Sequence, residues 1–91
     1  METGIQKLRA LVETVRCGSI SGAARELDYS QSGVSRMIAD LEREWGVTLL
    51  ERGRRGVRLT ADAKLIMPFV EALCEDERRL AERVREVVGM E

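Results

Sequence analysis

The sequence predicts a mainly α-helical fold with one short β-hairpin. Apolar residues recur at helical spacing over most of the 91 residues, among which there is a single proline. Glycines and hydroxyl residues of the kind that cap helices separate these stretches. One segment near residue 55 instead alternates with a period of two and has a glycine on each side of its turn. A chain of this length forms one core, so we expect one small domain extended by a long helix.

The first two helices are expected to be short. Residues 5–16 form the first, with Thr3 as its N-cap and Gly18 at its end. The second covers about residues 21–27, and Ser21 can cap it. Its apolar face is rich in alanine, so another helix can approach closely. The buried face of the first helix carries Ile5, Leu8, Leu11, Val12 and Val15, at the spacing of an amphipathic helix.

The third helix is predicted over residues 31–45, between the N-cap candidate Ser30 and Gly46. No acidic residue precedes Asp40 in this helix, whereas a face that is merely solvated more often carries Glu and Lys. The outward face of its first turns is therefore a candidate binding surface. The core stripe comprises Val34, Ile38, Leu41 and Trp45, and the outward face comprises Ser32, Ser35, Arg36, Ala39 and Arg43.

A β-hairpin with a basic tip is predicted between residues 47 and 60. Its turn is Gly53-Arg54-Arg55-Gly56, and the residues after the turn alternate between apolar and basic. The chain as a whole has a net charge of −1, but residues 1–60 hold ten basic and eight acidic residues, which gives +2. The mean charge therefore hides a basic patch, whose arginines are Arg52, Arg54, Arg55 and Arg58.

A long final helix is expected over residues 61–88, capped by Thr60. At 1.5 Å per residue it spans roughly 40 Å, which is more than so small a domain needs. Apolar residues recur along it every seven residues, and an exposed row of this kind would favour aggregation of a monomer. We therefore expect a homodimer whose interface is formed by Ile66, Val70, Leu73, Leu80, Val84 and Val87.

The composition argues against an enzyme, a metal site and a cofactor. There is no histidine, no phosphate-binding loop and no dinucleotide-binding glycine motif. Cys17 and Cys74 are the only cysteines and form no C-x-x-C pair, so we expect reduced thiols that contribute to packing. The sequence contains no apolar run of membrane-spanning length and no signal peptide, so we expect a cytoplasmic, nucleoid-associated protein.

The order of the elements is that of a winged helix-turn-helix. A helix fits the major groove of DNA, and its N-terminal side chains reach the base edges. Helix N-termini attract phosphates through free N–H groups, and Ser21 and Ser30 are expected at two such termini. Arg54 and Arg55 at the tip of the wing can reach the adjacent backbone or the minor groove. We therefore predict double-stranded DNA as a partner.

Several stretches together resemble the DNA-binding domain of LysR-type transcriptional regulators. They are Gly18-Ser19-Ile20-Ser21-Gly22-Ala23-Ala24-Arg25-Glu26-Leu27, Ser30-Gln31-Ser32-Gly33-Val34-Ser35-Arg36, Leu41-Glu42, Gly46-Val47, Leu50-Glu51-Arg52 and Gly56-Val57-Arg58-Leu59-Thr60. The resemblance covers about residues 5–88. The sequence departs from the family at Ser32, where proline is usual, and at Gly33, where alanine is frequent.

This resemblance implies a DNA-binding domain over residues 1–60 and a linker and dimerisation helix over residues 61–91. It places Gln31, Ser32, Ser35 and Arg36 on the DNA, and it implies an antiparallel dimer that binds an inverted repeat. The family's effector-binding domain is absent, so a small-molecule effector would act only through a domain not present here. We expect an excised DNA-binding fragment.

Two alternatives remain open at this point. The chain can be a winged-helix module with a coiled-coil arm that binds proteins and not DNA, or the related domain of a molybdate-responsive regulator. Individual residues have alternatives too: Arg36 can form an ion pair with Asp40, and Arg54 and Arg55 can simply solvate the tip of the hairpin.

Overall fold

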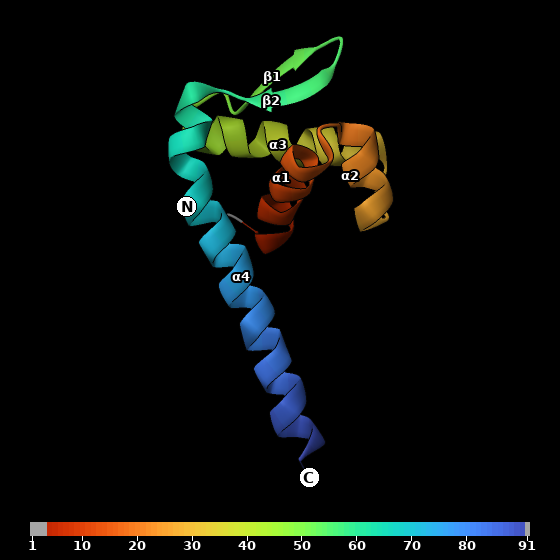
Figure 1. Cartoon of the computed structure of the whole chain (residues 1–91), viewed down its shortest axis with the longest axis vertical. Coiled ribbons are helices and arrows are strands. Elements are labelled where there is room, and N and C mark those ends of the chain that lie inside the picture. The colour runs from red at the N-terminus through yellow and green to blue at the C-terminus, as the bar shows by residue number, and fades with distance from the viewer. Residues whose placement is uncertain (1–3, 91) are drawn as a thin grey trace.

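The computed structural model describes residues 4–90, which form four helices and one β-hairpin at the edge of the domain (Figure 1). The order and type of the elements confirm the predicted, mainly helical fold. Their bounds are Ile5–Cys17 for α1, Ile20–Leu27 for α2, Gln31–Trp45 for α3, Leu50–Gly53 for β1, Gly56–Leu59 for β2 and Ala61–Gly89 for α4.

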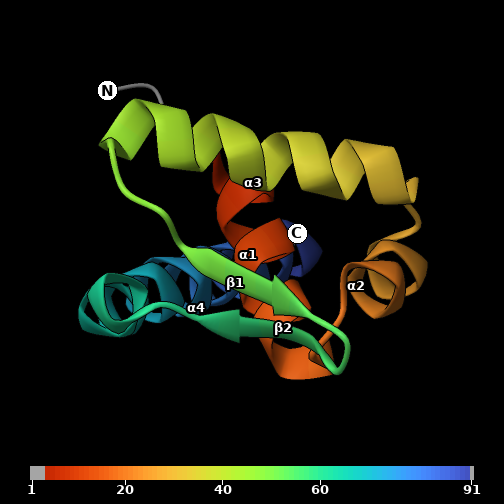
Figure 2. The same ribbon diagram turned by 90° about the horizontal axis from the view of Figure 1, so that it is seen from above.

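Helix α1 lies in the middle of the domain and packs against α2, α3, α4 and β2 (Figure 2). Leu11 of α1 is fully buried, together with Ile38 and Leu41 of α3. Thr14 is also fully buried, and its hydroxyl donates a hydrogen bond of 2.7 Å to the carbonyl of Ala10. This bond satisfies the polar group within α1 itself, so α1 can present an apolar surface to its neighbours.

The predicted caps of α3 and α4 are confirmed. The hydroxyl of Ser30 accepts a hydrogen bond from the N–H of Gly33 at 3.0 Å, and that of Thr60 accepts one from Ala63 at 3.1 Å. Thr60 also closes the base of the hairpin, because its N–H donates to the carbonyl of Leu49 at 3.0 Å. One residue thus joins the end of the wing to the start of α4.

The predicted caps of the first two helices differ from what is observed. Helix α2 begins at Ile20, and Ser19 is its N-cap: the Ser19 hydroxyl accepts a hydrogen bond of 3.0 Å from the N–H of Gly22. Ser21, the predicted cap, lies inside the first turn of the helix. Thr3 lies outside the described residues, and Gly4 is the N-cap of α1, with no side chain to accept a hydrogen bond.

Strands β1 and β2 pair antiparallel and form the two-stranded wing. Leu50 at the start of β1 is buried, whereas the remainder of β1 and both arginines of the turn are exposed. The wing is therefore anchored at its base and solvated at its tip. The register is Leu50 with Leu59, Glu51 with Arg58, Arg52 with Val57 and Gly53 with Gly56.

The first turns of α4 belong to the core of the domain. Ala63, Met67 and Val70 are buried, and Cys74 is partly buried against the same core. Val70, predicted to contact a second chain, instead packs within its own chain, where only 3% of its surface is exposed. Beyond these turns α4 projects away from the other elements (Figure 1).

A second apolar stripe follows the outward side of α4. Phe69 and Leu65 stand in this stripe with 73% and 75% of their surfaces exposed. Neither residue belongs to the interface predicted from the sequence, because the seven-residue spacing starts there from Ile66, which is half-buried and packs against the core. We call this feature the outer stripe; its members are Leu65, Phe69, Leu73, Leu80, Val84 and Val87.

The position of the α2 cap can be tested by a pair of substitutions. Ser19→Ala removes the acceptor for the N–H of Gly22 and should lower the free energy of unfolding by about 1 kcal/mol. Ser21→Ala is the matched control and should change it by less than about 0.5 kcal/mol. Urea unfolding at one fixed protein concentration measures both. A larger decrease for Ser21→Ala would contradict the assignment of the cap.

Candidate nucleic-acid interface

Helix α3 presents a polar face to solvent, on the side predicted from the sequence. Gln31, Ser32 and Arg36 are exposed, and Ser35 is half-buried at the edge of the face. The opposite side of the helix is fixed in the core by Val34, Ile38 and Leu41, which are fully buried. Rotation of α3 about its axis would expose this stripe, so packing determines which side chains face outward.

The N-terminus of α3 is tightly organised. The hydroxyl of Ser30 lies 3.3 Å from that of Ser32, in addition to its capping bond with Gly33. A Cβ atom on Gly33 would lie 3.0 Å from the Ser30 hydroxyl oxygen, which is a tight contact. Gly33 therefore leaves room for the cap, at a cost of about 1 kcal/mol in helix propensity relative to alanine.

The wing concentrates exposed positive charge. Arg54 and Arg55 occupy its turn, and Arg52 and Arg58 flank the turn on the two strands; all four side chains are exposed. The only acidic residue of the hairpin, Glu51, lies opposite Arg58 in the ladder. The tip is therefore locally cationic, although the whole chain has a net charge of −1.

The wing and the start of α3 point toward the same side of the molecule. In both views the turn between β1 and β2 lies at the same end of the domain as the N-terminus of α3, next to α2 (Figures 1 and 2). The hairpin extends beside α3 (Figure 2), and Gln31, Ser32 and Arg36 of that helix are exposed. One extended ligand can therefore contact the helix and the hairpin at once.

The arginines on this side are not neutralised by carboxylates. Among residues 4–90, none of the ion pairs involves Arg36 or an arginine of the wing. The predicted alternative partner of Arg36, Asp40, instead pairs with Arg43 and lies 3.5 Å from the ammonium of Lys7. Arg36 thus remains available to an anionic ligand.

Elsewhere in the described part of the chain, several cations pair with carboxylates. Lys7 of α1 lies 3.3 Å from Glu44 of α3, and this hydrogen bond raises the pKa of Lys7 above its usual value. On α4, Arg78 contacts Glu75 and Glu82, and its hydrogen bond lowers the pKa of Glu75. These cations are neutralised within the chain, unlike Arg36 and the arginines of the wing.

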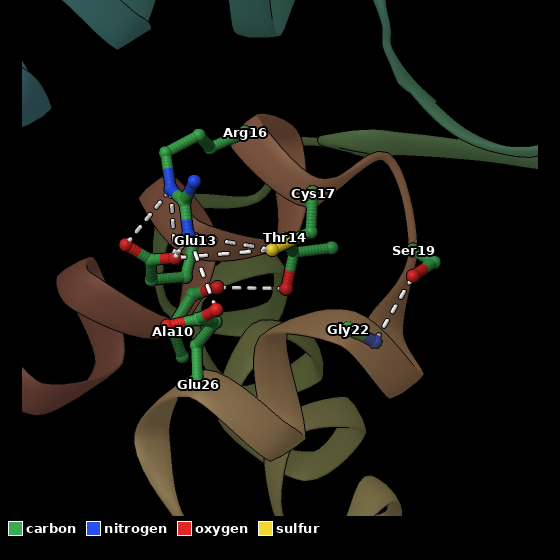
Figure 3. A network of polar contacts seen from close by, with 8 residues as sticks. All are labelled: Ala10, Glu13, Thr14, Arg16, Cys17, Ser19, Gly22 and Glu26. Atoms are coloured by element: carbon green, nitrogen blue, oxygen red, sulfur yellow. Dashed lines mark hydrogen bonds and ion pairs between the residues drawn. The ribbon is translucent and has the colours of Figure 1, made fainter.

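A polar network holds the corner between α1 and α2 (Figure 3). Arg16 pairs with Glu13 at 2.7 Å, which raises the pKa of Arg16, and lies 3.9 Å from Glu26 of α2. Ser19 caps α2 on the other side of the corner. The predicted site residue Ser21 is half-buried in the first turn of α2, so its contact with DNA stays a prediction.

Glu42 has a positioning role that the sequence analysis did not assign. Its carboxylate accepts a hydrogen bond of 2.7 Å from the N–H of Leu49 and a longer one of 3.4 Å from Leu50. These bonds connect the middle of α3 to the start of the wing. Leu41-Glu42 was one of the stretches that resemble the family. The contact between Glu42 and Leu49 could not be predicted, because it joins a helix to the loop after it and leaves no periodic pattern in the sequence.

The two cysteines and the length of the helices were also addressed by the sequence predictions. Cys17 and Cys74 are free thiols, and burial raises the pKa of Cys74. No helix in the described part of the chain is long and apolar enough to cross a membrane.

An exposed helix face without acids at its start, beside an arginine-tipped hairpin, defines a winged-helix DNA-binding domain. The chain belongs to the LysR family of bacterial regulatory helix-turn-helix proteins, whose family model matches residues 5–64. This membership favours DNA binding over the alternative of a protein-interaction module, and the LysR family over the molybdate-responsive regulators.

Individual relatives agree with this assignment. The chain is 47% identical over 73 residues to the probable HTH-type transcriptional regulator LrrA of Synechococcus elongatus, covering 80% of this chain and 24% of LrrA. It is also similar to the CbnR DNA-binding domain in a complex with DNA, with a TM-score of 0.81 and 31% identity over 97% of this chain and 99% of that one. The BenM DNA-binding domain bound to catB site 1 DNA has a TM-score of 0.84, with 31% identity and 97% of each chain covered. The chain thus spans about a quarter of the length of its curated relative.

The positioning role of Glu42 predicts a graded decrease in stability. Glu42→Ala leaves the N–H groups of Leu49 and Leu50 without their carboxylate acceptor and should lower the free energy of unfolding by about 1–3 kcal/mol. Glu42→Gln retains one acceptor oxygen and should have a smaller effect. Urea unfolding measures both, and Arg36→Ala, whose side chain is exposed and forms no ion pair among the described residues, provides a control on the same helix. Equal stability of Glu42→Ala and the parent chain would refute the role.

Proposed function

We propose that this chain is the sequence-specific DNA-binding part of a bacterial transcriptional regulator that acts as a dimer on an inverted repeat. The observation that carries the proposal is the common orientation of two cationic or acid-free elements, the start of α3 and the wing, whose arginines have no ion-pair partner among the described residues. Regulation and the response to an effector are properties of a whole regulator. This chain corresponds to about a quarter of the length of its relative LrrA.

The two elements have different tasks in this proposal. Helix α3 enters the major groove, where the side chains of its first turns contact base edges. The amide of Gln31 suits adenine and the guanidinium of Arg36 suits guanine. The wing arginines contact the adjacent phosphates or the minor groove, and the helix N-termini near Ser21 and Ser30 face phosphates. The base-contacting set is Gln31, Ser32, Ser35 and Arg36.

The outer stripe of α4 supports a dimer formed by a second copy of the same chain. Its leucines, valines and phenylalanine are more than half exposed in the single chain. Burial of one such side chain stabilises an assembly by about 1.5–3 kcal/mol. The proposed interface is therefore the outer stripe. Compared with the interface predicted from the sequence, it gains Leu65 and Phe69 and loses the half-buried Ile66 and the buried Val70.

The spacing of the outer stripe favours one antiparallel register. A two-fold axis between Asp76 and Glu77 places Leu73 opposite Leu80 of the second copy. The same axis places Phe69 opposite Val84 and Leu65 opposite Val88. In this register, each of these exposed apolar side chains lies opposite another one from the second copy. In a parallel dimer the same side chains would be matched only if each residue lay opposite its own copy.

Substitutions should divide DNA binding by element. Arg54→Ala or Arg55→Ala should weaken all DNA sequences nearly alike and reduce the slope of log affinity against log salt by about one for each phosphate that is no longer neutralised. Gln31→Ala or Arg36→Ala should cost roughly 1–3 kcal/mol on a selected site and little on random DNA. Arg79→Ala on α4 is the control. Fluorescence anisotropy at several salt concentrations measures these effects, and the reverse division would contradict the assignment of the two elements.

The dimer register predicts a specific cross-link. In a chain without its native thiols (Cys17→Ala, Cys74→Ser), Asp76→Cys should form a disulfide-linked dimer on oxidation, because the two copies of residue 76 lie about 1.5 Å apart along the axis. Arg78→Cys, on the opposite side of the helix, should remain monomeric in denaturing electrophoresis.

Analytical ultracentrifugation tests the interface independently of its register. The double change Leu73→Glu, Leu80→Glu should give a monomer, because the dimer would have to bury charge without a partner. A dimer that persists in this variant would exclude the outer stripe, whereas a dimer that fails only to cross-link at residue 76 would exclude the register.

A further inference from the structure

The wing is attached to the corner between α1 and α2 by one backbone hydrogen bond. The N–H of Val57 in β2 donates this bond, of 3.1 Å, to the carbonyl of Gly18. Gly18 ends α1 in the left-handed conformation, with φ of 71°, and immediately precedes the Ser19 cap of α2. The wing therefore takes its position from the first turn of the helix-turn-helix.

This attachment depends on the absence of a side chain at Gly56. A Cβ atom there would lie 2.2 Å from the carbonyl oxygen of Gly18, far inside any real contact. It would have to retreat by at least 0.8 Å to reach 3.0 Å, and the obstacle is backbone that cannot rotate away. The φ of Gly56 is +108°, a conformation that side chains rarely permit.

The second glycine of the same hairpin has no such requirement. Gly53 pairs with Gly56 across the ladder, but a Cβ atom at Gly53 would meet nothing within 4 Å and its φ lies outside the left-handed region. The need for glycine at residue 56 therefore comes from the close approach to Gly18 and from its positive φ. Gly53 provides an internal comparison.

The attachment lies next to the cationic tip. Arg54 and Arg55 immediately precede Gly56, and residues 51–55 are all exposed. The other fixed points, at Thr60 and at the start of β1, lie at the base of the hairpin. The Val57–Gly18 bond is thus the fixed point nearest the tip, and it determines how far the two arginines stand from α2 and α3.

We propose that Gly56 is a positioning residue for DNA binding: its bare backbone lets the wing attach to Gly18, so that Arg54 and Arg55 reach the DNA while α3 occupies the groove. This inference rests on the proposed function of the wing. It concerns a residue that touches no DNA itself and that acts through the two arginines.

The experiment compares Gly56→Ala with Gly53→Ala in the whole 91-residue chain, on a DNA duplex selected from random sequence. Gly56→Ala should reduce the slope of log affinity against log salt by about one for each phosphate that the wing no longer reaches. Gly53→Ala should leave the slope unchanged. Amide hydrogen exchange should show faster exchange at Val57 for the first variant only, and circular dichroism should show unchanged helix content for both.

The decisive measurement repeats Gly56→Ala in a chain that also carries Arg54→Ala and Arg55→Ala. If Gly56 acts through these arginines, its substitution should cause no further decrease in DNA affinity there, although Val57 still exchanges faster. An equal decrease in both backgrounds would overturn the proposal and indicate a general defect of the fold. Val57→Pro, which removes the donor of the same hydrogen bond, should reproduce the shallower slope if Gly56→Ala does not fold.

Two failures remain distinguishable in this design. If the arginine substitutions weaken binding but Gly56→Ala does not, the positioning role is wrong and the proposed function of the wing stands. If the arginine substitutions themselves have no effect on affinity or on its salt dependence, the wing does not bind DNA, and the positioning role fails with it.

Discussion

The burial of α1 is the constraint on which the rest of the structure depends. Every other helix and the second strand of the wing pack against α1, and Leu11 at its centre is completely buried. The proposed recognition surface contains no residue of α1, yet α3 and the wing are both oriented by it. α3 contributes Ile38 and Leu41 to the same core, and the wing attaches to Gly18 at the end of α1. A change in α1 would therefore alter the angle between the two DNA-facing elements.

The charge distribution complements this packing. Several charges outside α3 and the wing pair within the chain, as Lys7 does with Glu44 and Arg9 does with Glu77. Exposed pairs of this kind contribute little stability each. Their larger consequence is that they neutralise several cations elsewhere, whereas the four arginines of the wing and the nearby Arg36 stay exposed without an ion pair among the described residues. A chain with a net charge of −1 can then bind a polyanion through one face, because salt screens the acidic far end of α4 beyond roughly 8–10 Å.

Much of this arrangement was predictable because it follows from periodic or local signals. The buried stripe of α3 specified which side of that helix faces outward, and the hydroxyl of Ser30 marked its start. The choice between Ser19 and Ser21 was not local, because both are hydroxyl residues near the start of α2 and packing of the intervening residue against the core decides between them. The close approach of Gly56 to Gly18 spans two helices, and no spacing rule reveals it. A glycine beside an arginine turn looks like a turn residue, so its role as a point of attachment becomes visible only when the backbone of α1 is in place.

Helix α4 shows why a correct periodicity can still identify the wrong residues. It carries two apolar stripes, one facing the domain through Met67 and Val70 and the other facing solvent through Phe69 and Leu73. Counting sevens from Ile66 mixed the two, because Ile66 lies between them. The division has a mechanical consequence. Packing of the inner stripe against the core fixes the direction of α4 relative to α1, and the outer stripe remains exposed in the single chain. In the proposed dimer, the same helix transmits the orientation of one recognition surface to the other, so the separation of the two half-sites in the proposed inverted repeat follows from the packing of α4 against its own domain.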